Sequence, residues 1–325
     1  MQIVLNTFGT MLNRDNEGFV VTQQEMRQRI PADDVDSIQI SNGASITSDA
    51  VLLAIEKEIQ IIFVDKSGSP KGRIWSPKYG SISTIRKGQL SFVQSSQAVR
   101  WICDVIIRKI ANQQALILAM AQGNTELTRI NPAILRLQNY QRKITELQAD
   151  RVQDIAATLR GWEGAASRIY FDTMNMFLPE YMRFAERSQH PARDAFNACL
   201  NYGYGMLYSK IEGALIKAGI DPYIGILHRD EYNRPVLVYD VIELYRIWVD
   251  YVVFRLAKQN VITSDCYSII ADGAYRLEGL GRRIIIQSVN DYLDELVEIN
   301  GLSRTRQTHI DLYAQDLAQK FKSFN

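Results

Sequence analysis

The sequence has few of the features that mark secreted, membrane-spanning or zinc-binding proteins. Its three cysteines, Cys103, Cys199 and Cys266, are far apart and form no CxxC pair. We therefore expect reduced thiols, with no disulfide framework and no structural zinc site. The chain contains no run of 18 apolar residues, and its first residues, MQIVLNTFGTMLNRDNEG, lack both a basic leader and a long apolar core. We expect a cytoplasmic protein without a membrane span or signal peptide.

The chain also lacks a strong overall charge. Its formal net charge is only +1 at pH 7, whereas a nucleic-acid-binding domain usually carries a basic stripe. Residues 86–109 hold five basic side chains and one acid. A local basic patch and a set of solvated helix faces explain this stretch equally well.

What the chain does have is length and apolar content. Its 325 residues, 46% of them hydrophobic, allow about two domains with buried cores. The first 80 residues alternate and turn like a β domain, and Ser48 is expected to cap a short helix over residues 50–55. We expect short strands at residues 1–8, 18–23, 37–41, 59–64 and 71–76, the last two paired as a hairpin.

Residues 77–81 have the composition of a linker, and a helical period follows it. Apolar stripes run through residues 88–121, 133–157 and 201–217, and the tail from 279 to 325 is also expected to be helical. Asn131-Pro132 is typical of a helix start. The predicted fold class is therefore α+β, with a small β-rich domain at 1–80 and a larger all-α domain at 81–325.

The stretch from Ala218 to Arg246 contains the most suggestive polar residues. Asp240 and Glu243 lie three apart in an apolar run of helical period, so their carboxylates would project about 60° apart on one helix face. His228 precedes them across a turn. Two carboxylates and one imidazole make a divalent-metal site when they converge. A surface helix that shows both acids to water is the alternative that this spacing leaves open.

Three segments resemble, in order, those of the CRISPR-associated integrase family, Cas1, and the resemblance covers nearly the whole chain. The first is a G-x-E-G-x-A-A-x-x-Y run, the second a D-x-x-N-x-x-L-x-x-G-Y run, and the third a G-[IL]-D-P-x-x-G-x-L-H run followed by D-x-x-D or D-x-x-E. The matching residues are Gly161, Glu163, Gly164, Ala166, Tyr170; Asp194, Asn197, Leu200, Gly203, Tyr204; and Gly219, Asp221, Pro222, Gly225, Leu227, His228, Asp240, Glu243.

The resemblance implies a catalytic site made of Glu163, His228, Asp240 and Glu243. In the family, residues at the positions of Glu163, His228 and Glu243 bind one Mg²⁺ or Mn²⁺, while the acid at Asp240 lies beside the ion and orients a ligand. This chain has Glu at position 243, where many relatives have Asp. We expect phosphate contacts from nearby basic residues, namely Arg160, Arg168, Lys210, Arg229 and Arg246.

The function implied is a metal-dependent DNA integrase and endonuclease. The 3′-hydroxyl of a short DNA fragment would attack a phosphodiester in a CRISPR array and so insert a new spacer. Family membership also implies a homodimer through the N-terminal domain and a complex with the companion protein Cas2. Two alternatives are a stand-alone metal-dependent nuclease or transposase-like enzyme and a noncatalytic DNA-binding scaffold.

Overall fold

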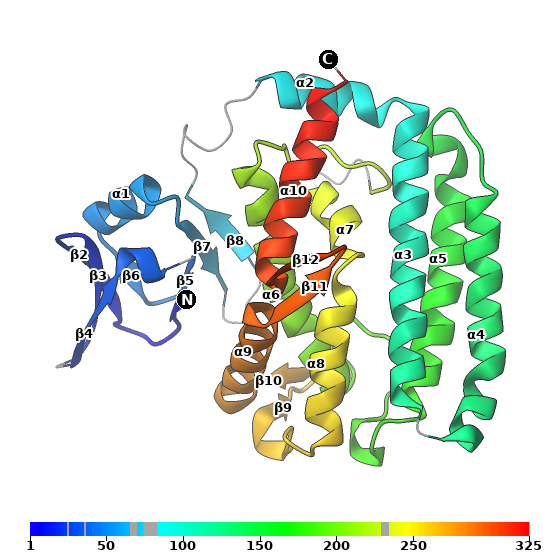
Figure 1. Ribbon diagram of the computed structural model, residues 1–325. Helices are drawn as coiled ribbons and strands as arrows, with labels where there is room; N and C mark the ends of the chain where they lie inside the picture. Colours follow the sequence, from blue (N-terminus) through cyan, green and yellow to red (C-terminus); the bar gives the residue numbers. More distant parts are fainter. Residues whose placement is uncertain are drawn as a thin grey trace. The chain divides into compact units, whose positions relative to one another are not determined.

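The structure, a computed structural model, describes residues 1–24, 26–35, 37–65, 70–74, 83–121, 123–228 and 234–324 (Figure 1). The chain divides into two compact units, Met1–Ser81 and Ile82–Asn325. The linker expected at residues 77–81 lies outside the described residues. Each unit is described by itself below.

In the described residues of the first unit, two four-stranded sheets accompany one α-helix. In one sheet β1 (Gln2–Leu5), β5 (Ser37–Ser41) and β7 (Gln60–Val64) are parallel neighbours, and β8 (Pro70–Arg73) pairs antiparallel with β7. In the other, β4 (Met26–Pro31), β3 (Gly18–Gln23) and β2 (Met11–Asp15) form an antiparallel meander, and β6 (Ser45–Ile46) pairs parallel with β2. Helix α1 (Ser48–Glu56) packs against β2 and β7. The core is built from Leu12, Phe19, Ile38, Ile40 and Leu53.

Several expectations for this unit are confirmed and others are wrong. The strands at 18–23 and 37–41 were predicted with their observed bounds, and the β7–β8 hairpin places Ile62 opposite Arg73. We did not predict β2 or β4, in each of which only one residue is buried. The cap of α1 is Thr47 and not Ser48, because the Thr47 hydroxyl accepts the N–H of Ala50 at 3.4 Å.

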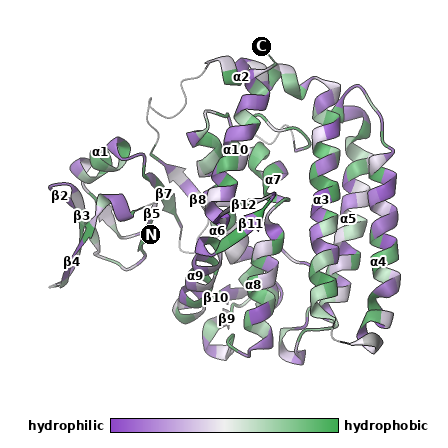
Figure 2. Ribbon diagram, viewed as in Figure 1, coloured by the Kyte–Doolittle hydropathy of each residue, from purple (hydrophilic) through white to green (hydrophobic). Residues whose placement is uncertain are grey.

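The second unit is mostly helical. Its long helices α3 (Ser96–Met120), α4 (Asn124–Thr145) and α5 (Val152–Asn175) run side by side, and hydrophilic and hydrophobic residues alternate along them (Figures 1 and 2). Helix α6 (Ala195–Lys217) is buried on most sides by its neighbours. Those neighbours are α7 (Val236–Ile242), α8 (Arg246–Lys258), α9 (Gly279–Asp294) and α10 (Arg306–Lys322), while α2 (Ser83–Val93) packs on α10.

The helical unit departs from our expectations at four places. Asn131-Pro132 does not begin a helix, because Pro132 lies inside α4, where packing against α3 and α5 outweighs the propensity cost of proline. Two predicted stripes are each split between two helices, 88–121 between α2 and α3 and 133–157 between α4 and α5. Asp240 and Glu243 were expected on one helix, but α7 ends at Ile242, so Glu243 follows the helix, and α8 begins at Arg246.

The fourth departure is a pair of short hairpins in the described part of this unit, where we expected helices. They are β9 (Tyr267–Ile269) with β10 (Tyr275–Leu277) and β11 (Leu296–Ile299) with β12 (Leu302–Thr305). Asn300 and Gly301, with φ of +53° and +76°, connect the second pair. An Asn-Gly dipeptide favours such a two-residue turn because both positions need positive φ. Within the described residues, no helix is both long enough and apolar enough to cross a membrane.

Candidate metal and nucleic-acid site

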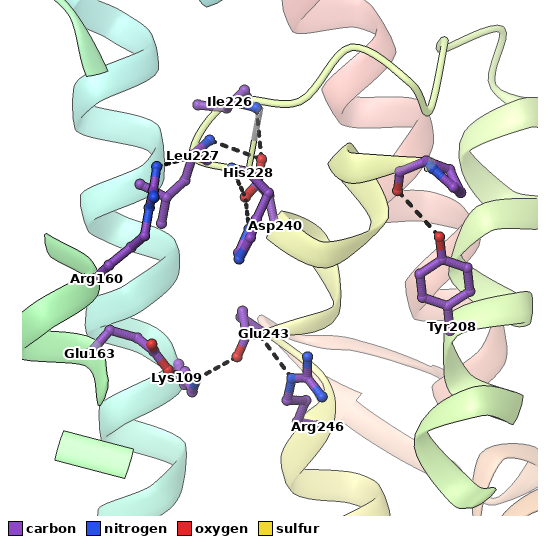
Figure 3. A network of polar contacts seen from close by, with 11 residues as sticks. Lys109, Arg160, Glu163, Tyr208, Ile226, Leu227, His228, Asp240, Glu243 and Arg246 are labelled. Carbon is purple, nitrogen blue, oxygen red and sulfur yellow. Dashed lines mark hydrogen bonds and ion pairs between the residues drawn. The ribbon is translucent and has the colours of Figure 1, made fainter. Parts of the chain in front are cut away.

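Asp240 organises the loop that carries His228. Its side chain, fully buried on α7, accepts the backbone N–H groups of Ile226 at 2.7 Å and Leu227 at 3.1 Å through Oδ2. Its Oδ1 accepts the backbone N–H of His228 at 3.2 Å and lies 2.7 Å from the ring nitrogen Nδ1 of the same residue (Figure 3). One carboxylate therefore fixes both the path of the loop and the orientation of the imidazole.

Helix α2 holds the same loop from another side. The buried side chain of Gln89 donates from Nε2 to the carbonyl oxygens of Asp221 at 2.8 Å and Ile224 at 3.1 Å, and its Oε1 accepts the Asp221 N–H at 3.0 Å. Gly225 lies between these contacts and His228. A Cβ at Gly225 would come within 2.0 Å of the His228 carbonyl oxygen. The loop can close this tightly only because residue 225 has no side chain.

Next to this loop, two carboxylates meet one lysine. Lys109 of α3 hydrogen-bonds to Oε1 of Glu163 on α5, and its Nζ lies 2.6 Å from Oε2 of Glu243, the residue that follows the last residue of α7 (Figure 3). Glu163 Oε1 also accepts the hydroxyl of Ser167 at 2.9 Å. The other oxygen of Glu243, Oε1, accepts from Nε of Arg246 at 2.9 Å.

The surrounding charges keep Lys109 and Glu243 ionised. Burial would raise the pKa of Glu243, but Arg246 and Lys109 lower it to about 2. Burial would lower the pKa of Lys109, but the charges of Glu243 and Glu163 raise it above its usual value. At His228 burial again acts to lower the pKa, and the hydrogen bond and charge of Asp240 raise it above its usual value. Lys109 and Glu243 are therefore charged at neutral pH.

The structure brings the four predicted site residues into one region, with a cation already between two of them. Among the residues described, no three Asp, Glu, His or Cys side chains form a metal-binding group. The donor chemistry nevertheless fits a divalent ion, because Glu163 and Glu243 converge on one positive charge. The Nδ1 contact to Asp240 leaves Nε2 as the ring nitrogen of His228 that can ligate a metal.

The predicted phosphate-binding residues fall into different surroundings. Arg160 and Arg168 are exposed on α5, and Nη2 of Arg160 donates to the carbonyl of Leu227 at 3.3 Å, next to His228. Lys210 is half-buried on α6. Arg246 is half-buried, is ion-paired with Glu243 and lies over the ring of Tyr204 at 4.7 Å, so its role here is that of an internal counter-ion. Arg229 lies outside the described residues.

From the sequence we missed the roles of Lys109 and Gln89. A signal for Lys109 was available, because this lysine stands three and four residues after Ile106 and Val105, within an apolar stripe. A lysine on a buried helix face needs a partner of opposite charge. No comparable signal existed for Gln89, whose partners lie 132 and 135 residues away.

Comparison with solved structures identifies the fold. In fold, the chain is similar to a casposase bound to an integration product, with a TM-score of 0.82 and 20% identity over 100% of this chain and 91% of that one. It also matches a chain of a Cas6-RT-Cas1--Cas2 complex, with a TM-score of 0.82 and 23% identity, covering 99% of this chain and 35% of that chain. These likenesses define the class of fold, which confirms the predicted α+β arrangement.

Sequence similarity defines the family. The family model for "CRISPR associated protein Cas1" matches residues 3–291. The CRISPR-associated endonuclease Cas1 1 of Archaeoglobus fulgidus is 29% identical over 332 residues, which cover 98% of this chain and 95% of that protein. The chain belongs to the Cas1 family, as the resemblance of its three segments indicated.

Proposed function

We propose that this chain is a divalent-metal-dependent DNA integrase with endonuclease activity. It would join the 3′-hydroxyl ends of short DNA fragments to phosphodiesters of a CRISPR array, and would cut DNA when water is the nucleophile. Relatives named CRISPR-associated endonucleases and a structural neighbour bound to an integration product support this reading. The observation that carries it is the convergence of Glu163 and Glu243 on one cationic position, beside an imidazole held by Asp240.

In this proposal Glu163, Nε2 of His228 and Glu243 hold one Mg²⁺ or Mn²⁺. A bound ion would polarise a phosphoryl oxygen and offset the negative charge that grows in the transition state. Asp240 acts as a positioning residue, because its contacts are to the His228 ring and to three backbone N–H groups. Mixed oxygen and nitrogen donors suit Mn²⁺ well and Mg²⁺ adequately.

The substrate contacts are assigned from exposure. Arg160 and Arg168 are exposed on the helix that carries Glu163, so they are the stronger candidates to bind DNA phosphates. Lys210 and Arg229 remain candidates of the same kind. We assign homodimer formation to the N-terminal unit and Cas2 as the protein partner, since a fold neighbour is named as a Cas1–Cas2 complex. Phosphate contacts of this type position DNA without reading its sequence.

A second candidate is a transposase-like enzyme that joins strands without a CRISPR array. The likeness to a casposase favours it, because that neighbour is bound to an integration product. A noncatalytic scaffold is the third reading, and it predicts DNA binding that does not depend on Glu163 or His228.

The test is strand transfer by the purified chain, with and without Cas2. Short DNA with labelled 3′ ends is mixed with supercoiled targets that either carry or lack a leader and repeat, in Mn²⁺, Mg²⁺ or EDTA. His228→Ala is compared with His190→Ala, because His190 is an exposed histidine in another loop and serves as a matched control. We expect metal-dependent joining that His228→Ala abolishes and His190→Ala retains.

Each other outcome points to a different reading. Equal joining to both targets would favour the transposase-like enzyme, and cleavage without joining would favour the nuclease. Joining that survives His228→Ala would refute this site. DNA binding without joining or cleavage would favour the noncatalytic scaffold.

A further inference from the structure

Both carboxylate oxygens of Glu243 already have cationic partners. Oε1 accepts from Nε of Arg246 at 2.9 Å, and Oε2 lies 2.6 Å from Nζ of Lys109. The same Nζ hydrogen-bonds to Oε1 of Glu163. A divalent ion that binds Glu243 on the side facing Glu163 must therefore take the place that the Lys109 ammonium now holds.

We propose that Lys109 is the resident cation of the metal site, and that a divalent ion binds by displacing its ammonium group. Lys109 then lowers the affinity of the site for metal and stabilises the two carboxylates whenever no ion is bound. This inference rests on the proposed function, because it takes Glu163 and Glu243 as ligands. It goes further by assigning a role to a residue outside the family motifs.

The contacts distinguish Lys109 from Arg246 as the cation that leaves. Lys109 contacts both proposed carboxylate ligands, whereas Arg246 contacts only Glu243. Arg246 is also held by the ring of Tyr204, with the guanidinium carbon 4.7 Å from the ring centroid. Only the place between Glu163 and Glu243 offers an ion both carboxylates.

An ammonium and a divalent ion cannot share that place. Mg²⁺ binds oxygen at about 2.0–2.1 Å, so an ion on Glu243 Oε2 would lie in contact with the present position of Nζ. Repulsion between the two positive charges rises as their separation and the local dielectric fall. Binding is therefore an exchange of one cation for another.

The ammonium group of Lys109 can move away from the carboxylates toward solvent on the side of Glu163. The side chains of Lys109 and Glu243 are each only 9% exposed, but that of Glu163 is 26% exposed, so the cluster opens to solvent on the Glu163 side. A Cβ at the neighbouring Gly164 would meet nothing within 4 Å. A lysine stem of four carbons can swing its ammonium toward this open side.

The experiment measures Mn²⁺ binding directly, by the electron paramagnetic resonance signal of free Mn²⁺, on the full chain after treatment with EDTA. Thermal unfolding is recorded with and without Mn²⁺. Lys109→Met removes the charge while keeping an unbranched stem, and Lys258→Met, at an exposed lysine of α8, is the matched control. For Lys109→Met we expect a dissociation constant about tenfold lower, a lower Tm without metal and a larger rise of Tm with Mn²⁺. Lys258→Met should behave like the unchanged chain.

An unchanged or higher dissociation constant in Lys109→Met would overturn the inference, because the ion would then not compete with the ammonium. If Lys109→Met does not fold, Lys109→Gln takes its place, because the glutamine amide can hydrogen-bond to the carboxylates. The Mn²⁺ dissociation constant must fall in this variant too. The proposed site is tested separately through His228→Ala and Glu163→Gln. If neither His228→Ala nor Glu163→Gln weakens Mn²⁺ binding, the site itself is refuted. If both weaken it but Lys109→Met leaves the dissociation constant unchanged, only the exchange of cations is refuted.

Discussion

Gln89 and Asp221, 132 residues apart in sequence, are joined by a reciprocal pair of hydrogen bonds. The Gln89 amide donates to the Asp221 carbonyl at 2.8 Å and accepts the Asp221 N–H at 3.0 Å. The same amide also donates to the carbonyl of Ile224. Helix α2 therefore supports the loop that ends in His228, although it contributes no residue to the proposed chemistry.

Replacing Gln89 by Leu should destabilise the chain by about 2 to 3 kcal/mol, because buried backbone groups of the loop lose their partners. Leu has a similar volume, so the change removes hydrogen bonds without opening a large cavity. Urea unfolding measures the effect, and Gln97→Leu on the exposed face of α3 is the control. Equal free energies of unfolding for the two variants would show that the hydrogen bonds of Gln89 do not stabilise the chain.

Replacing Asp240 by Asn should destabilise the chain by about 2 to 4 kcal/mol. One carboxylate oxygen becomes an NH₂ group, which would face N–H donors that need an acceptor. The pKa of His228 should also fall, since Asp240 raises it. An NMR titration of the histidine ring protons, assigned with His228→Ala, checks this. The control is Asp316→Asn on α10, and a His228 pKa that stays the same in Asp240→Asn would contradict the assigned contact.

Mn²⁺ affinity and stability should show opposite pH trends around His228. The folded pKa of His228 is raised above 6.5, so its stabilisation is complete below pH 6.5 and is lost as pH rises through the folded value. Metal binding needs the neutral ring, so Mn²⁺ affinity should rise over the same interval and weaken at mildly acidic pH. Isothermal titration calorimetry at several pH values measures the affinity. A profile that is equally flat in the unchanged chain and in His228→Ala would exclude the imidazole as a ligand.

Asp250 should make the free energy of unfolding decrease as pH rises from about 4 to about 6. This side chain on α8 is 2% exposed and accepts the hydroxyls of Tyr170, at 2.9 Å, and of Tyr204. Burial raises its pKa from 3.8 to about 6, against the lowering effect of those hydrogen bonds. The folded chain therefore binds more protons than the unfolded chain in this interval, and stability decreases as pH rises.

Asp250→Asn removes this titration, so its stability relative to the unchanged chain should improve by about 2 to 3 kcal/mol from pH 4 to pH 7. Urea unfolding at four pH values measures the difference. The exposed Asp265→Asn should show none of this change. A difference for Asp250→Asn that is constant with pH would mean that its pKa is not raised.

Two glycine substitutions should act in opposite directions. A Cβ at Gly88 of α2 would lie 1.9 Å from the backbone oxygen of Phe321 on α10, whereas one at Gly161 of α5 would meet nothing within 4 Å. Gly88→Ala should destabilise the chain by about 3 kcal/mol, and Gly161→Ala should stabilise it by up to about 1 kcal/mol. Thermal unfolding of both variants checks this. Equal effects would mean that the two helices separate without penalty.

The sequence predicted local structure best where a segment's own pattern decides it. The strand at 18–23 has buried residues bounded by turns, and it was found with its observed ends. The edge strand β4 was missed because five of its six residues are exposed, so no alternation appears. At the site, the motifs indicated which acids and histidine matter. The Lys109 contacts could not be derived, because they depend on how α3, α5 and the end of α7 pack together.

The helix that supports the His228 loop packs against the last helix of the chain, α10. Phe92 of α2 contacts the rings of Phe321 and Phe324, at centroid distances of 5.2 Å and 5.0 Å. Gln89, which hydrogen-bonds to the loop that ends in His228, is on that same helix. On the ribosome α2 emerges early and α10 late, so α2 can pack on α3 at once but on α10 only after synthesis has passed Phe321. A chain that ends before α10 therefore carries every motif residue, but the helix that bears Gln89 lacks its packing on Phe321 and Phe324.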